Sequence, residues 1–420
     1  MESPAKPKTR SLLTILIGTA VICLLIGGIL GYAISSFNTS SLISGLQSNV
    51  STLEKQVSDL QSTNNSTSGN VTYVNSTYEN TTYVLGDNVS LPQLYEQVKN
   101  SVVVVQGLIA VYGFFGQLVG YAEVQGSGFV SNLTGQFVII TNYHVVDGAT
   151  NITVTFIDGN TYVANVTGSD PYADLAVLST SAPQDAYNPL AITSSSTLQV
   201  GDPVLALGNP YGLAGSVTSG IVSALGRTIT ESTSGGYDIA DCIQTTTPIN
   251  AGNSGGPLLN YKGEVVGITT AIVSNSQGLG FAIPSSSILR EIESLITNGS
   301  YSNHPWLGAS GTDMSLGIAQ AMNTNVTYGW LITQITSGGP ADKAGLRAGT
   351  AQVQVSGTSV RVGGDIITAI NGARIRNTDD LLAYLEEYTL PGQTISVAVV
   401  RSNETLTLSL VLGARPLPSA

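Results

Sequence analysis

The sequence has few charges, few histidines and few cysteines, and each shortage excludes a class of function. Charged residues make up 10% of its 420 residues, whereas soluble domains typically carry about 25%. The net charge of −12 argues against a nucleic-acid partner, since binding phosphates needs clustered Lys and Arg. Cys23 and Cys242 are too few for a disulfide framework or a cysteine-type zinc site. We expect no metal and no cofactor, and imidazole chemistry can occur only at His144 or His304.

The first part of the chain predicts a membrane anchor. Residues 1–11 contain Lys6, Lys8 and Arg10, and residues 12–34 are uncharged. A helix over 12–34, rising about 1.5 Å per residue, would cover the roughly 30 Å of hydrocarbon in a bilayer. A cleaved signal peptide is the alternative, but its apolar part is usually shorter. Because the basic residues precede the apolar segment, we expect 1–11 in the cytoplasm and the rest of the chain outside the cell membrane.

Residues 35–90 are rich in Ser, Thr and Asn and predict an extended stalk. Eight Asn-x-Ser/Thr sequons lie between residues 38 and 88, which favours a glycosylated segment. Apolar residues alternately three and four positions apart predict a short coiled coil. These residues are Ile43, Leu46, Val50, Leu53, Val57 and Leu60. An unpaired helix or a loose linker is the alternative, because three heptads are few.

Beyond the stalk, the sequence predicts two folded domains that are mostly β. From 91 to 300, short apolar runs are broken by Gly, Asn, Asp and Pro, which is typical of an all-β sandwich or barrel. The runs are 102–105, 137–141, 152–156, 175–178, 204–207 and 265–270. A helix at 285–296 is predicted to close this domain. Residues 304–416 predict a small α+β module, with strands at 366–370, 394–400 and 405–411 and a helix at 379–388.

One glycine-rich segment can carry a nucleophile. Residues 245–258 read TTTPINAGNSGGPL and place Ser254 among glycines. Such a loop can expose a serine hydroxyl on a sharp turn and direct successive backbone N–H groups into one concavity, as acyl transfer requires. A glycine-rich hairpin turn with no chemistry is the alternative.

Two further segments supply the partners that a serine nucleophile needs. His144 follows the apolar run 138–141 and can act as a general base near neutral pH. Asp174 directly precedes the run 175–178 and can accept the Nδ1 proton of His144 and fix its tautomer. Asp170 is the rival for this role, although a position directly before proline is more typical of a turn.

With the order His144, Asp174, Ser254 and these flanks, the chain resembles the HtrA/Deg family of chymotrypsin-fold serine proteases. The matching segments are 126–129 (GSGF), 141–146 (TNYHVV), 174–178 (DLAVL), 207–212 (LGNPYG), 252–258 (GNSGGPL) and 280–284 (GFAIP). The resemblance implies two six-stranded β-barrels, with Ser254 as nucleophile, His144 as general base and then acid, and Asp174 as the orienting carboxylate. It also implies an oxyanion hole at Gly252, Asn253 and Ser254, with the N–H groups of Gly252 and Ser254 as donors.

The resemblance further implies a specificity pocket at Pro248, Thr270 and Ala271. Trypsin-like proteases of this fold carry an Asp where this chain has Pro248. An uncharged pocket cannot compensate a buried Lys or Arg, so we expect cleavage after small or medium aliphatic residues. The chain departs from the family at Thr246, where an acidic residue is frequent, and at Thr269, where an Asn is common.

Residues 304–416 resemble the PDZ domain that follows the protease in this family. Leu307, Gly308 and Ala309 stand where the peptide carboxylate would bind, and the turns at 337–346 and 362–367 match the module. The helix 379–388, capped by Asn377 or Thr378, would line the groove for a C-terminal peptide. Core packing explains its apolar residues equally well; these are Leu381, Leu382 and Leu385.

Together these features predict a membrane-anchored serine endopeptidase that cleaves unfolded or damaged extracytoplasmic proteins and captures their C-termini with its PDZ domain. A chaperone or scaffold acting through PDZ binding is one alternative, but it would not need all three of Ser254, His144 and Asp174. A hydrolase of small esters is another, and it would lack a PDZ module. The family resemblance implies a homotrimer, whereas Ile and Val at position a with Leu at d favour a parallel dimer.

Overall fold

The computed structural model describes residues 90–208, 216–230, 238–250, 252–270 and 279–416. The predicted anchor at 12–34, the stalk with its coiled coil, most of the segment 207–212 and Ala271 lie outside these residues. Among the helices of the described ranges, none is long and apolar enough to cross a membrane. The first described helix is α2 (Leu91–Val98), which begins after Ser90 because the Ser90 side chain accepts the N–H of Gln93.

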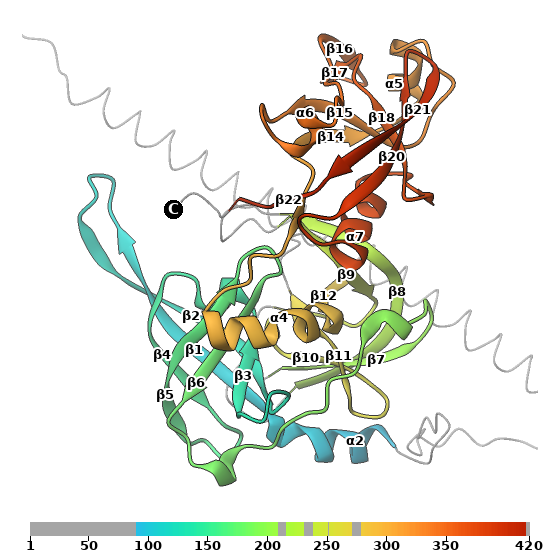
Figure 1. Ribbon diagram of the computed structural model, residues 1–420. Helices are drawn as coiled ribbons and strands as arrows, with labels where there is room; N and C mark the ends of the chain where they lie inside the picture. The colour runs from blue at the N-terminus through green and yellow to red at the C-terminus, as the bar shows by residue number, and fades with distance from the viewer. Residues whose placement is uncertain (1–89, 209–215, 231–237, 251, 271–278, 417–420) are drawn as a thin grey trace, which may run out of the picture. The chain divides into compact units, whose positions relative to one another are not determined.

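Two closed, antiparallel, six-stranded barrels follow α2 (Figure 1). The strands of the first are arranged in the order β1-β2-β3-β6-β5-β4, and those of the second in the order β10-β11-β12-β9-β8-β7. The first barrel is built from β1 (Val102–Tyr112), β2 (Leu118–Ser131), β3 (Val138–Thr141), β4 (Ala149–Thr155), β5 (Thr161–Asp170) and β6 (Leu175–Thr180). The second is built from β7 (Pro203–Gly208), β8 (Ser216–Thr230), β9 (Asp238–Thr245), β10 (Pro257–Asn260), β11 (Val265–Thr270) and β12 (Gly280–Pro284). The predicted mostly β, double-barrel fold is confirmed.

Branched aliphatic side chains fill both barrels, because they suit a pleated surface that is buried on one face. Val103 and Ile139 lie in the first interior, and Val222 and Leu258 lie in the second. A third and larger cluster joins the two barrels. It includes Phe129, Ile140, Leu175, Leu207, Leu259 and Ile268, together with residues of α2 and of the helix α4. The loops at the junction of the barrels are therefore held by a continuous core.

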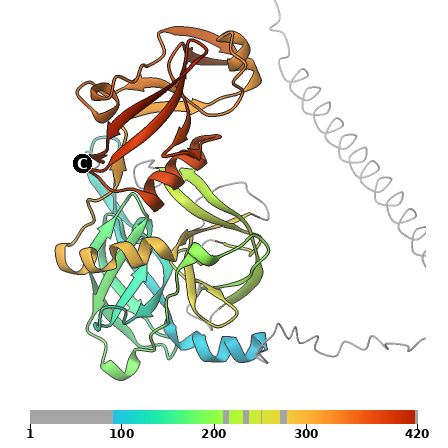
Figure 2. The same cartoon turned by 45° about the vertical axis from the view of Figure 1, so that its right-hand side comes forward.

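Helix α4 (Ser285–Asn298) covers this junction, as Figures 1 and 2 show. It contacts β5 and β6 of the first barrel and β11 and β12 of the second. Its buried residues Ile288, Ile292 and Leu295 recur every three or four positions and so share one face. The helix ends at Gly299, which adopts the left-handed φ of 76° that glycine tolerates best. The predicted closing helix at 285–296 is present and extends to Asn298.

The C-terminal region forms a second, smaller β structure with three helices. Its main sheet has the order β14-β15-β18-β20-β21, with β19 paired to β18; β13 pairs with β22 and β16 with β17. The strands are β13 (Pro305–Trp306), β14 (Ala309–Asp313), β15 (Trp330–Ile335), β16 (Ala351–Val355), β17 (Thr358–Val362), β18 (Ile366–Ile370), β19 (Ala373–Arg374), β20 (Thr394–Arg401), β21 (Glu404–Val411) and β22 (Gly413–Ala414). The helices are α5 (Leu316–Ala321), α6 (Pro340–Lys343) and α7 (Thr378–Tyr388).

Helix α7 connects this region to the second barrel. The Asn377 side chain accepts the N–H of Asp380 and caps the helix. Leu381 and Leu385 are buried in the core of the C-terminal region, which confirms core packing for these two leucines, whereas Leu382 is half-buried. The opposite side of α7 contacts β8 and β9. There the Asp379 carboxylate accepts from the backbone N–H of Thr228 at 2.8 Å and from the guanidinium of Arg227 at 3.1 Å.

Candidate active site

The two barrels contribute different members of the predicted catalytic set. His144 lies in α3 (Tyr143–Val146), a single helical turn directly after β3. Asp174 lies in the turn between β5 and β6, and Ser254 lies in the loop between β9 and β10. The first barrel therefore carries the histidine and the aspartate, and the second carries the serine.

His144 and Asp174 form a close, largely buried pair. The Nδ1 atom of His144 lies 2.9 Å from Oδ2 and 3.0 Å from Oδ1 of Asp174, and the backbone N–H of His144 also donates to Oδ1 at 3.0 Å. Asp174 is 1% exposed. Because an ionised carboxylate only accepts hydrogen bonds, Nδ1 carries the proton in the neutral ring. Nε2 is then the nitrogen that can accept one.

The backbone of Asp174 is held in an uncommon conformation. Its φ of 50° lies in the left-handed region, which non-glycine residues seldom adopt. The carbonyl of Asp174 accepts from Asn142 Nδ2 at 3.0 Å and from the N–H of Tyr143 at 3.1 Å. These bonds fix the aspartate against the start of α3, and strained backbone of this kind concentrates at functional sites. Nothing in the sequence around Asp174 indicated this conformation.

The Ser254 loop needs glycine at several positions. Gly252 and Gly255 have φ values of 93° and 87°. A Cβ atom on Gly255 would lie 2.1 Å from the carbonyl oxygen of Ser127 in the first barrel, which leaves no room for a side chain. Ser127 also donates its N–H to the Ser254 carbonyl and its hydroxyl to the Gly252 carbonyl, both at 2.7 Å. The loop is thus bound to β2 on both sides of its serine.

The same strand brings the serine loop close to the histidine. A Cβ atom on Gly126 would lie 2.7 Å from the side chain of Val145 and 2.9 Å from the carbonyl oxygen of Ser254. Val145 is the neighbour of His144 in α3. The GSGF segment at 126–129 therefore has a physical function, because only a glycine at 126 lets α3 and the Ser254 loop approach β2 together.

Backbone N–H groups in the loop differ in their availability. The Asn253 N–H donates to the Asn250 carbonyl at 3.0 Å, and the Gly256 N–H donates to the Asn253 carbonyl at 2.9 Å. Asn253 therefore uses its own N–H within the turn. The oxyanion-hole roles of the Gly252 and Ser254 N–H groups stay predictions.

Of the residues predicted for the specificity pocket, two are described. Thr270 is buried, and its hydroxyl donates to Asp174 Oδ2 across 3.5 Å, so it lies beside the His144–Asp174 pair. Pro248 is exposed, and its carbonyl accepts from the Thr218 hydroxyl at 2.9 Å. Neither residue brings a charge, and the pocket assignment stays a prediction.

The two departures from the family pattern both act as internal braces. The Thr269 hydroxyl donates to the Asn253 carbonyl at 2.7 Å and to the Gly256 carbonyl at 3.1 Å, on either side of Ser254. The Thr246 hydroxyl accepts from the N–H of Ile221 at 3.0 Å. The Thr269 hydroxyl thus adds to the bonds by which Ser127 holds the serine loop.

The predicted carboxylate loop lies at one edge of the C-terminal sheet. The carbonyl of Leu307 accepts from Ala341 at 2.8 Å, and that of Gly308 accepts from Thr336 at 2.9 Å. Because the C=O and N–H groups of a trans peptide unit point in opposite directions, the N–H groups of Gly308 and Ala309 point away from the Ala341 and Thr336 donors. Gly308 has a φ of 72°, and β14, which starts at Ala309, is an edge strand among the described strands.

Asp170, the rival for the orienting role, has a different partner. It lies at the end of β5, and its Oδ2 atom is 2.7 Å from Nε2 of His304, while Oδ1 accepts the N–H of Tyr172 at 2.9 Å. The turn from Tyr172 to Asp174 separates the two aspartates, so each meets one of the two histidines. The Asp170–His304 pair could not be predicted from local sequence patterns, because the two residues are far apart in the chain.

Comparison with known proteins agrees with this architecture. A trypsin-like peptidase domain profile matches residues 126–268 and a PDZ domain profile matches residues 314–412. The chain is 35% identical over 334 residues to the chloroplastic Protease Do-like 1 of Arabidopsis thaliana, covering 79% of this chain and 73% of that protein. It is 37% identical over 296 residues to a probable periplasmic serine endoprotease DegP-like of Chlamydia trachomatis, covering 70% of this chain.

The chain spans about half the length of the DegP-like relatives it matches, 54% in the Chlamydia protein and 53% in that of Brucella suis. Among solved structures, the HtrA-type protease AlgW with a tripeptide superposes with a TM-score of 0.60 at 30% identity, covering 79% of this chain and 99% of that one. The likeness thus extends over both barrels and the C-terminal sheet.

Proposed function

The chain belongs to the HtrA/Deg family of serine proteases, and from that premise we propose that it hydrolyses peptide bonds in unfolded or damaged extracytoplasmic proteins. The observation that carries the proposal is the His144–Asp174 pair. Asp174 is buried, held by two bonds to its carbonyl, and directed at Nδ1 of His144 from 2.9 Å. A scaffold protein would have no need of this arrangement beside a glycine-rich loop that carries a serine.

The chemistry follows from these positions. Nε2 of His144 would take the proton of the Ser254 hydroxyl as Oγ attacks the substrate carbonyl, and would then give it to the departing amine. Asp174 would stay ionised, keep the ring in the correct tautomer and stabilise the imidazolium that forms. Water would then attack the acyl-enzyme with the same proton transfers through His144, and Ser254 would be regenerated. The N–H groups of Gly252 and Ser254 would stabilise the oxyanion of each tetrahedral intermediate.

The C-terminal region would select substrates by their ends. A free carboxylate could bind at the N–H groups of Leu307, Gly308 and Ala309, and the peptide would then add to the edge of β14. The AlgW relative was solved with a tripeptide and with a decapeptide, which supports peptide binding in this part of the family. The uncharged residues Pro248 and Thr270 support cleavage after aliphatic rather than basic residues.

We also propose that residues 12–34 anchor the protein in the membrane, with the stalk and the protease on the extracytoplasmic side. The uncharged stretch behind Lys6, Lys8 and Arg10 supports this orientation. Relatives named as periplasmic proteases are in agreement with it. A homotrimer, as the family resemblance implies, completes the proposal.

Labelling with a fluorophosphonate tests the catalytic part. The reagent should modify one serine, and peptide mapping should place it at Ser254. Ser254→Ala should remove the label and the hydrolysis of casein, whereas Ser195→Ala should keep both, although Ser195 is equally buried at 7% exposure. If the wild-type chain took no label yet bound C-terminal peptides, it would be a scaffold rather than a protease.

A further inference from the structure

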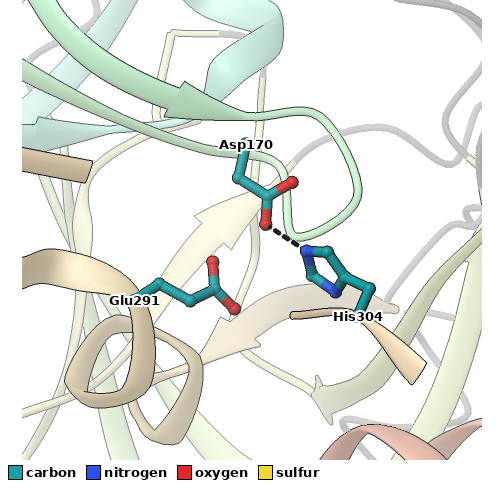
Figure 3. A group of neighbouring side chains, drawn as sticks. All are labelled: Asp170, Glu291 and His304. Carbon is teal, nitrogen blue, oxygen red and sulfur yellow. Dashed lines mark hydrogen bonds and ion pairs between the residues drawn. The ribbon is translucent and has the colours of Figure 1, made fainter. Parts of the chain in front are cut away.

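A second cluster of a histidine and two carboxylates is buried away from the His144–Asp174 pair. Asp170 at the end of β5, Glu291 of α4 and His304 before β13 converge from three segments of the chain (Figure 3). Their exposed fractions are 1%, 0% and 2%. One potential ligand atom of each residue lies within 4.8 Å of those of the other two.

Each of the three side chains is oriented by a partner on its outer atom. Asp170 Oδ1 accepts the Tyr172 N–H at 2.9 Å, and Glu291 Oε1 accepts from Arg290 at 2.5 Å. His304 Nδ1 lies 3.1 Å from the Glu386 carboxylate. A carboxylate on the far nitrogen of an imidazole is the usual partner of a metal-binding histidine, since it fixes the tautomer that leaves the other nitrogen as a ligand.

The inner atoms point toward one another and are incompletely satisfied. Asp170 Oδ2 and His304 Nε2 are 2.7 Å apart. Glu291 Oε2 is buried and has no hydrogen-bond donor among the described residues, which is costly for a carboxylate oxygen in the interior. Either a proton or a cation held between these atoms would relieve this cost.

The local charges match a divalent cation. Asp170, Glu291 and Glu386 contribute three negative charges when ionised, and the partly buried Arg290 offsets one of them. A neutral His304 then leaves two negative charges, which one divalent cation would balance. Buried charges are tolerated only when they are paired in this way.

From this geometry we propose that Asp170, Glu291 and His304 bind one divalent transition-metal cation, for which Zn²⁺ is the best match. The site goes beyond the proteolytic function proposed above and does not depend on it. One imidazole with two carboxylates suits zinc, whereas Ca²⁺ and Mg²⁺ prefer oxygen ligands only. At metal–ligand distances of about 2.0–2.1 Å, tetrahedral ligand atoms lie about 3.3 Å apart, so the Asp170–His304 contact would open by about 0.6 Å.

The competing occupant of the same place is a proton shared by Glu291 and Asp170, with His304 protonated. That arrangement has the same net charge and needs no metal, so only binding experiments separate the two. The chain offers one advantage for this purpose. Because His144 and His304 are its only histidines, a His144→Ala chain without an added histidine tag has a single imidazole.

The experiment measures Zn²⁺ binding to the full-length His144→Ala chain by competition with a chromophoric chelator, followed by X-ray absorption at the zinc edge. We expect one Zn²⁺ per chain and one imidazole in its coordination shell. Glu291→Gln should weaken binding by at least about 100-fold, and Glu386→Gln by about 10- to 100-fold through loss of the histidine's partner. Glu293→Gln, an exposed position on the same helix, should change it less than about twofold.

Failure to bind Zn²⁺ at about 100 µM would overturn the proposal in favour of the shared proton. So would an affinity that Glu291→Gln and Glu386→Gln leave unchanged, or a zinc shell without imidazole. If Glu291→Gln does not fold, Glu386→Gln provides the decisive comparison, because Glu386 is at the surface of the cluster and contacts the metal only through His304.

Discussion

Replacing Asp241 by Asn should stabilise the protein increasingly as the pH rises from 3.8 to about 7, and should leave its stability below this window unchanged. Asp241 lies in β9 beside α7, with a left-handed φ of 59° that asparagine also tolerates. Burial raises the pKa of its carboxyl from 3.8 to about 7, the negative charges of Glu387 and Glu386 raise it too, and Arg290 opposes them. Ionisation of Asp241 is therefore unfavourable in the contact between β9 and α7.

The sign of the effect follows from proton linkage. Between pH 3.8 and about 7 the folded state holds a proton on Asp241 that the unfolded state has lost, so the free energy of unfolding falls as the pH rises through this window. The difference between the two pKa values corresponds to at most about 4 kcal/mol. Asparagine stays neutral and avoids this loss. Because 1 kcal/mol moves the unfolding temperature by about 2–4 °C in domains of 150–250 residues, even half of it is measurable.

The assay is the unfolding midpoint of the full chain from pH 4 to pH 8.5, taken as the difference between variant and wild type at each pH. That difference should grow through the window and level off above about pH 7. Glu387→Gln should give part of the gain, since it removes one repelling charge, whereas Asp238→Asn, at an exposed position of β9, should run parallel to wild type. A difference that is flat across the range would refute the reasoning.

Three further predictions concern the proposed protease. Asp174→Asn should lower the kcat for casein by about 10⁴-fold because the imidazole loses its correct tautomer. A folded Asp170→Asn chain should keep most of its activity. The reverse result would give the orienting role to Asp170. Mass-spectrometric mapping of casein fragments should show cleavage after Val, Ala or Leu, and mostly Lys or Arg at that position would contradict an uncharged pocket. A C-terminal peptide with an apolar last residue should bind at about micromolar Kd. Its amidated form should bind much more weakly, because it lacks the carboxylate that the loop at Leu307 would bind. Equal binding of the two peptides would exclude carboxylate capture.

The strands and helices that bury a continuous apolar face could be predicted from the sequence. The run 265–270 coincides with β11, and 366–370 coincides with β18. β1 was predicted only over 102–105, yet it extends to Tyr112. Its second half lies in a hairpin with β2 that leaves Tyr112 and the tip residues Phe114 and Phe115 largely exposed, so burial there gives no periodic signal.

The site was predictable only where one local segment carries the chemistry. Ser254 is marked by its glycines, and Gly255 is needed because β2 occupies the space of a side chain. The choice between Asp174 and Asp170 could not be made with certainty, since it depends on how the β5–β6 turn directs each carboxylate. The cluster around His304 joins residues from β5, α4, the segment before β13 and α7. These residues are far apart in the chain, so no local spacing could predict that they meet.

Closure of the two barrels has a consequence for the proposed action on unfolded chains. β1 pairs with both β2 and β4, and the second barrel closes in the same way. In the first barrel, the described part of β2 before Phe129 pairs only with β1, so a free strand edge remains along this projecting hairpin. Misfolded polypeptides aggregate by adding to free strand edges. Among the described strands of the main C-terminal sheet, such edges remain at β14 and β21. An aggregation-prone chain could therefore add at these edges and at the β1–β2 hairpin, but not along the closed walls of the barrels.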